Sequence, residues 1–157
     1  MNEDLQEDII DAVVNGNLSF LKTFPSHDLT KMQTIAEYTL LHWAAQESQI
    51  EIISFLISIG CKVDAEDDCG HTPLQKACGE DSIEGVRLLL SAGADPNYRA
   101  HDQGTVLMTA VCYASPEIVE LLIKSGALKD SQDDEGKSAL DYARMHNRKK
   151  MIKMLQD

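Results

Sequence analysis

The chain has 157 residues, of which 43% are hydrophobic and only 5% aromatic, and its formal net charge is −12 at pH 7. This length supports one cooperative domain, and the acidic balance argues against a nucleic-acid-binding protein, which needs clustered Lys and Arg to contact phosphates. The longest apolar runs are too short to span a membrane and the acidic first four residues do not resemble a signal peptide, so we expect a soluble, cytoplasmic protein.

Residues 5–24 are predicted to form two short helices joined by a tight turn at Gly16 and Asn17. Acidic residues precede and line the first of these helices, where negative charge suits a helix N-terminus. The residues expected to be buried are Ile9, Ala12, Val13, Leu18, Phe20 and Leu21. The following stretch, residues 25–31, lacks the Gly-Ala-Asp-x-Asn ending that the later units approach, and no element is predicted for it.

From residue 36 onward, the same pattern of residues returns at a fixed interval of 33. The columns that repeat are Thr39, Thr72, Thr105 and Ser138; Leu41, Leu74, Leu107 and Leu140; Ala44, Ala77, Ala110 and Ala143; and Leu56, Leu89, Leu122 and Leu155. In each unit the Thr or Ser can cap a first helix, and a strongly apolar second helix follows. The second helices end at Gly60, Gly93 and Gly126, a residue type that accepts the left-handed conformation after a helix. The sequence therefore predicts stacked two-helix units.

The clearest copy runs from Gly70 to Cys78 and reads Gly-His-Thr-Pro-Leu-Gln-Lys-Ala-Cys. This segment resembles the Gly-x-Thr-Pro-Leu-His-x-Ala-Ala pattern of the ankyrin repeat family. The resemblance implies an all-α ankyrin-repeat solenoid of about five helix-turn-helix repeats with short turn or hairpin tips, capped at both ends. The expected limits are an N-terminal cap at 1–35, repeats at about 36–68, 69–101 and 102–134, and a C-terminal capping repeat at 135–157.

One match to the family pattern and one departure from it carry their own expectations. The second repeat keeps His42, and the resemblance implies that this His bridges Thr39 and the backbone of a neighbouring loop. In the fourth repeat Gly104 comes one place late, so we expect a displaced loop around Gln103.

The four cysteines are predicted to be free thiols. Cys61 and Cys78 occupy columns that hold small residues elsewhere, and the chain has no Cys-x-x-Cys pair. Cys69 and His71 are the only close Cys/His pair, and a structural zinc site would need two more ligands. We therefore expect no cofactor and no metal. A small-molecule or metal-binding protein that uses Cys69, His71 and the acidic turns is the alternative.

The sequence offers no nucleophile with a base and an orienting acid, and no Gly-rich phosphate loop, so we expect no enzyme activity. What the resemblance implies is a non-catalytic protein–protein interaction module, acting as an adaptor or as an inhibitor of a partner enzyme in the manner of an immunity protein. The acid excess has two interpretations, which are solubility and a basic protein partner. The unbound chain is expected to be a monomer.

The family binds partners through the turn tips and the concave edge of each first helix. Carried over position by position, that surface comprises Tyr38, Trp43, Gln46, Glu47, Asp68, His71, Lys76, Glu80, His101, Asp102, Tyr113, Glu135, Lys137 and Tyr142. The only tryptophan, Trp43, has two interpretations. It is either an anchor for the partner or a cover for the junction with the first repeat.

Overall fold

The computed structural model describes residues 3–34 and 36–156. Within these residues the chain forms eleven helices: α1 (Glu3–Val14), α2 (Leu18–Leu21), α3 (Ser26–Lys31), α4 (Leu40–Gln46), α5 (Ile50–Ser58), α6 (Pro73–Gly79), α7 (Ile83–Ser91), α8 (Val106–Tyr113), α9 (Pro116–Lys124), α10 (Ala139–Met145) and α11 (Lys149–Gln156). The only bridges outside helices in this part of the chain are isolated pairs, Gln33 with Thr39, Arg99 with Thr105 and Gln132 with Ser138. The predicted all-α solenoid is confirmed.

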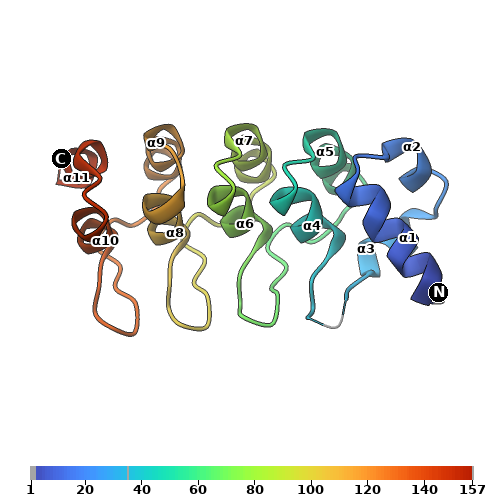
Figure 1. The fold of residues 1–157 in the computed structure, drawn as a ribbon, viewed down its shortest axis with the longest axis horizontal. Helices are drawn as coiled ribbons and strands as arrows, with labels where there is room; N and C mark the ends of the chain where they lie inside the picture. Colours follow the sequence, from blue (N-terminus) through green and yellow to red (C-terminus); the bar gives the residue numbers. More distant parts are fainter. Residues whose placement is uncertain (1–2, 35, 157) are drawn as a thin grey trace.

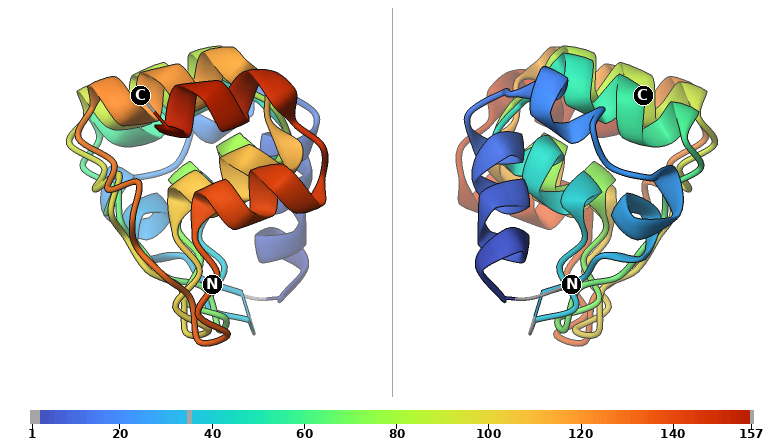
Figure 2. Two further views of the ribbon diagram at one scale, coloured as in Figure 1. Left: turned by 90° about the vertical axis from the view of Figure 1, so that its left-hand side faces the viewer. Right: turned by 90° about the vertical axis from the view of Figure 1, so that its right-hand side faces the viewer.

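The helices stack as pairs in a row, with four hairpin loops projecting from one edge of the stack (Figure 1). Helices α4, α6, α8 and α10 form an inner row next to these loops, and α5, α7, α9 and α11 form an outer row. Viewed along the stack, the repeats nearly superimpose and the hairpins gather at the same side (Figure 2). The first helix, α1, closes the N-terminal end by packing against α4. None of the described helices is both long and apolar enough to cross a membrane.

Each helix of the inner row begins at a capping box, as the column of Thr and Ser residues predicts. Thr39, Thr72, Thr105 and Ser138 have extended backbones, and their side chains accept a hydrogen bond from the backbone N–H three residues on. In α6, Pro73 occupies the first helical position, where its missing N–H has no cost.

The outer helices end as expected at Gly60, Gly93 and Gly126, whose φ angles are 90°, 92° and 92°. No atom lies within 4 Å of a Cβ placed at any of these glycines, so the positive φ alone explains the residue type. The displaced loop expected around Gln103 is not found, because Gln103 (φ 62°) takes the same left-handed position as Gly70 (φ 77°) and Gly136 (φ 73°), 33 residues to either side. Backbone hydrogen bonds from Ala100 N to Gly104 O and from Gln103 N to Ala100 O close this tip in the same way as the bonds from Asp67 N to His71 O and from Gly70 N to Asp67 O close the preceding one.

One hydrophobic core runs through the stack. The column of Leu56, Leu89, Leu122 and Leu155 is buried, and Leu89 in the central repeat has no exposed surface. The four cysteines are free thiols, of which Cys78 is in this core. A two-helix unit cannot enclose such a core alone, so each repeat depends on its neighbours.

Polar contacts also join successive repeats at the turns between inner and outer helices. Gln49 donates a hydrogen bond from Nε2 to the Val14 carbonyl at 2.6 Å, which ties the second repeat to α1. In the last repeat, the guanidinium of Arg148 donates to the carbonyls of Cys112 and Ala114 at the end of α8. These bonds satisfy carbonyl groups that have no partner inside a helix.

The N-terminal unit differs from the later repeats. Its second helix is only the single turn of α2, and a further helix, α3, occupies residues that showed no clear element in the sequence. Pro25 precedes this helix with a φ of −59°, and Leu29 within it is buried against the core. The stretch lacks the Gly-Ala-Asp-x-Asn ending of a regular repeat, and a helix that buries one leucine takes the place of that turn.

Candidate functional site

The hairpins, numbered second to fifth after the repeat whose inner helix follows each of them, form a connected ladder along one edge of the molecule. Each is closed by a backbone hydrogen bond across its tip, as from Asp67 N to His71 O at 3.0 Å. Neighbouring tips are joined by three further backbone bonds: Asp68 N to Ala36 O at 3.1 Å, His101 N to Cys69 O at 3.1 Å, and Asp134 N to Asp102 O at 3.3 Å. Side chains on the tips are therefore held at a regular spacing.

In the third hairpin, a buried carboxylate organises the tip. Asp67 Oδ1 accepts hydrogen bonds from the backbone N–H groups of Cys69 at 3.0 Å and His71 at 2.8 Å, and Oδ2 pairs with Lys76 Nζ at 2.8 Å. Burial acts to raise the pKa of Asp67, but the bonds from Lys76 and the His71 backbone outweigh it and hold this pKa below its usual value. The same Lys76 ammonium lies 5.1 Å from the centre of the Tyr38 ring.

The fifth hairpin repeats this arrangement with different side chains. Asp133 Oδ1 accepts from the N–H groups of Glu135 at 3.0 Å and Lys137 at 2.9 Å, while Oδ2 accepts from the Tyr142 hydroxyl at 2.6 Å. The hydrogen bond to Asp133 raises the pKa of Tyr142 to about 12. The side chains of Lys137 and Glu135 form an ion pair with each other. Lys137, Glu135 and Tyr142 are therefore already engaged with each other or with Asp133.

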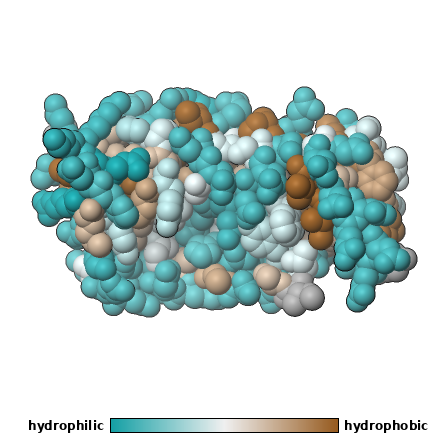
Figure 3. All heavy atoms as spheres, in the orientation of Figure 1, coloured by the Kyte–Doolittle hydropathy of each residue, from teal (hydrophilic) through white to brown (hydrophobic). Residues whose placement is uncertain are grey.

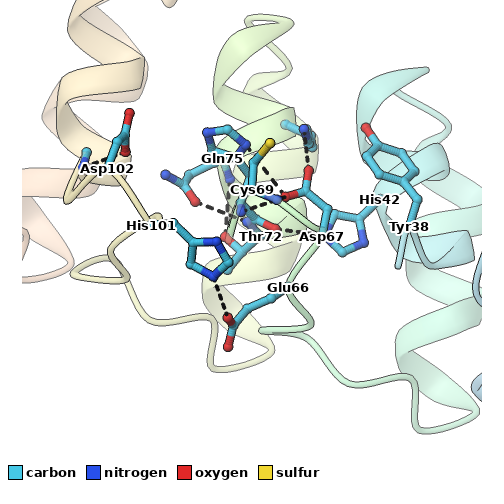
Figure 4. Close-up of polar contacts among 12 residues, drawn as sticks. Tyr38, His42, Glu66, Asp67, Cys69, Thr72, Gln75, His101 and Asp102 are labelled. Atoms are coloured by element: carbon cyan, nitrogen blue, oxygen red, sulfur yellow. Dashed lines mark hydrogen bonds and ion pairs between the residues drawn. The ribbon is translucent and has the colours of Figure 1, made fainter. Parts of the chain in front are cut away.

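His42 has the structural role that the resemblance implies. Its Nδ1 lies 2.8 Å from Thr39 Oγ1, and its Nε2 lies 3.0 Å from the carbonyl oxygen of His71 in the next hairpin. Figure 4 shows His42 reaching from α4 toward the third hairpin. Burial lowers the pKa of this imidazole, so the neutral form is favoured in the folded protein.

Tyr38 and Trp43 form an aromatic pair at the N-terminal side of the inner row. Their rings pack edge to face with centroids 5.1 Å apart, and the Tyr38 hydroxyl donates to Gln46 Oε1. Trp43 is half-buried and packs against the core, and its Nε1 is buried with no hydrogen-bond partner among the described residues. Trp43 therefore takes part in the packing of the array, while its roles as a cover for the junction with α1 and as a partner anchor both stay predictions.

Two large apolar side chains are exposed at the ends of neighbouring inner helices. Tyr113 at the end of α8 is 70% exposed, and Met145 at the end of α10 is 61% exposed. The sequence predicts Tyr113 as part of the binding surface but does not single out Met145, because the equivalent residue of the preceding repeat is the half-buried Cys112. Figure 3 shows that the hydrophobic residues on the face seen in Figure 1 lie in separate patches, among mostly hydrophilic side chains.

The predicted binding residues all lie on the hairpins, on the inner helices or at the ends of those helices. Those with exposed side chains are Glu47, Asp68, Glu80, His101, Asp102, Tyr113 and Glu135, and those that are half-buried are Tyr38, Trp43, Gln46, His71, Lys76, Lys137 and Tyr142. The half-buried group makes intramolecular bonds or packing contacts that a linear sequence does not reveal. Binding by this surface stays a prediction.

Comparison with known proteins agrees with the fold. A sequence model of the family described as ankyrin repeats (3 copies) matches residues 9–100 and 99–157. An ankyrin repeat-containing protein of Treponema pallidum is 33% identical over 144 residues, which cover 90% of this chain and 48% of that protein. The human transient receptor potential cation channel subfamily A member 1 is 30% identical over 156 residues, or 98% of this chain and 14% of the channel.

The mouse neurogenic locus notch homolog protein 1 is 35% identical over 106 residues, or 67% of this chain and 4% of that protein. The chain thus spans about half the length of the Treponema protein and a much smaller share of the other two. The 33-residue period, the capped inner helices, the hairpin ladder and the family match together establish that this chain belongs to the ankyrin repeat family.

Proposed function

We propose that this chain is a non-catalytic module that binds a basic segment of a protein partner along its hairpin tips and inner helices. The observation that carries the proposal is the row of exposed carboxylates on successive tips. Asp68, Asp102 and Asp134 are exposed, and no salt bridge among the described residues involves them. With a net charge of −12, the chain attracts cationic partners at long range.

The ladder of backbone bonds supports this proposal because it fixes the tips before a partner arrives. A surface that is already ordered loses little conformational entropy on binding, which raises affinity for a given set of contacts. Carboxylates on successive tips can also pair with Lys or Arg residues presented by an extended or helical segment.

Tyr113 and Met145 are the proposed apolar anchors. Both are large side chains on the inner row, and α10 packs directly against α8, so the two ends belong to adjacent repeats. Aromatic residues are enriched among the few side chains that dominate binding energy, and carboxylates around them orient the partner. Leu128, on the loop after α9, is 62% exposed but lies outside this surface, which makes it a matched control.

The test starts with capture of a partner from the source organism and measurement of its affinity for purified variants. Tyr113→Ser should weaken binding by about 2 kcal/mol, whereas Leu128→Ser should leave it unchanged. Asp68→Asn together with Asp102→Asn should slow association and reduce its salt dependence. Glu51→Gln together with Glu84→Gln, two exposed acids on the outer helices α5 and α7, controls for the same change in net charge.

Equal effects of the hairpin variants and the outer-row variants would refute this surface. A captured partner whose contact segment is acidic or apolar would refute the proposed chemistry. Adaptor and inhibitor roles are separated by adding the chain to a captured enzyme in equal amount. Loss of enzyme activity supports an inhibitor, and unchanged activity with recruitment of a third protein supports an adaptor.

A further inference from the structure

We propose that the third hairpin holds a binding site for a borderline-soft divalent cation such as Zn²⁺, with Asp67, Cys69 and His71 as the protein ligands. Each of the three offers one ligand atom, and these atoms all lie within 4.8 Å of one another. The inference goes beyond protein binding and does not rest on it.

The backbone of the hairpin brings these side chains together. Asp67 accepts the N–H groups of both Cys69 and His71, so the three alternate residues fold around one carboxylate. His71 Nδ1 is already 3.7 Å from Asp67 Oδ1. Figure 4 shows Asp67 and Cys69 side by side at the hairpin, between His42 and His101 of the neighbouring repeats.

The fifth hairpin supports the inference because it has the same backbone geometry with different side chains. There Asp133 binds the N–H groups at 135 and 137 in the same way, and the side chains of Glu135 and Lys137 meet in an ion pair. Side chains at these two positions therefore can touch across the tip. In the third hairpin the two positions hold the thiol of Cys69 and the imidazole of His71.

Thiolate, imidazole and carboxylate are all ligand types that Zn²⁺ binds, and a site with three protein ligands leaves a fourth tetrahedral position open for a further ligand. Bond lengths of about 2.0–2.3 Å in a tetrahedral site would place the ligand atoms about 3.3–3.8 Å apart. The ligand atoms must therefore approach by roughly 1 Å, which rotation of the exposed Cys69 and half-exposed His71 side chains can supply. Water or a side chain from a bound protein would fill the fourth position.

Lys76 competes with the cation for the Asp67 carboxylate. Its ammonium is 2.8 Å from Asp67 Oδ2 and neutralises the carboxylate that a metal would use. The Tyr38 ring, 5.1 Å from the same ammonium, offers Lys76 an alternative contact when it leaves Asp67. Removal of this positive charge should therefore strengthen metal binding at this hairpin.

The experiment uses the full chain, stripped with a chelator and kept reduced, and titrates it with Co²⁺ as a spectroscopic substitute for Zn²⁺. We expect one Co²⁺ per chain, a near-ultraviolet thiolate-to-cobalt absorption band, and loss of that band when Zn²⁺ is added. Cys69→Ser should abolish the band, and His71→Ala should weaken Co²⁺ binding at least tenfold. Lys76→Gln should bind Co²⁺ more tightly than the unchanged chain.

Cys112→Ser is the matched control, since this half-buried thiol lies in α8, away from the third hairpin. It should retain the full band, and circular dichroism should show that every variant is folded. Absence of the band in the unchanged chain, or its persistence in Cys69→Ser, would overturn the proposal. Calorimetry measures the affinity for Zn²⁺ directly. Equal affinity in the unchanged chain, in Cys69→Ser and in His71→Ala would also overturn the proposal.

Discussion

Replacement of Leu89 by Ala tests the packing of the stack at its centre. Leu89 lies on α7, has no exposed surface, and belongs to the outer row between α5 and α9. The substitution removes three carbon atoms, which corresponds to about 2.4 kcal/mol of lost hydrophobic transfer at about 0.8 kcal/mol per methylene group. Helices on both sides of α7 limit the collapse of the cavity, so a cavity cost of about 1 kcal/mol or more adds to this.

We therefore expect Leu89→Ala to lower the free energy of unfolding by about 3–4 kcal/mol. For a chain of 157 residues this corresponds to a fall in melting temperature of about 6–16 °C. Urea unfolding monitored by circular dichroism gives the free energy, and a thermal scan gives the melting temperature.

Two other leucines provide the comparison for this measurement. Leu128 is 62% exposed, so the same change there should alter stability by less than about 0.5 kcal/mol. Leu155 occupies the Leu89 column in the terminal helix α11, which packs on α9 and α10, and its replacement should cost less than that of Leu89. An unchanged urea midpoint for Leu89→Ala, or a larger loss for Leu155→Ala, would refute the packing argument.

Three further predictions concern single side chains. Because burial lowers the pKa of His42 in the folded state, the unfolded chain binds the proton more readily, and stability should fall as the pH drops below about 6.5. Replacement of His42 by Gln, the residue found at the equivalent position 75 of the next repeat, should weaken this pH dependence. Urea titrations at several pH values measure it. Arg148→Met removes the hydrogen bonds to carbonyls at the end of α8, so α10 and α11 should lose about 1–2 kcal/mol of local stability. This loss should appear as faster amide hydrogen exchange in the two helices, and unchanged exchange would contradict the role of Arg148. Trp43→Ala should lower the free energy of unfolding by about 2 kcal/mol while partner binding persists, because Trp43 packs on the core and on Tyr38. Unchanged stability with partner binding weakened by about 2 kcal/mol would instead identify Trp43 as an anchor.

The sequence by itself determined the repeat architecture. Columns such as Leu56 to Leu155 show which face of each helix is buried, because a period of 33 residues is maintained only when every unit packs in the same way. Helix caps such as Thr72 and terminal glycines such as Gly93 could also be predicted from the sequence, since each satisfies a local requirement of the backbone within a few residues.

Only the tertiary structure decided how the candidate surface is built. The Tyr38 hydroxyl bonds to Gln46, and the Tyr142 hydroxyl bonds to Asp133. Each bond joins residues eight or nine places apart that only the fold brings to the same edge. The exposure of Met145 and the packing of Trp43 depend on where an inner helix ends relative to its neighbour, which no local pattern specifies.

The third hairpin shows the same division. Cys69 and His71 stand out in the sequence as a close pair, but Asp67 reads as one acid among several in an acidic turn. The structure distinguishes it because its backbone and carboxylate close the tip, which buries Asp67 while Asp68 remains exposed. A local pattern can report which residue types are present. Which carboxylate faces inward depends on the hydrogen bonds of the folded turn and on Lys76 from the helix that follows it.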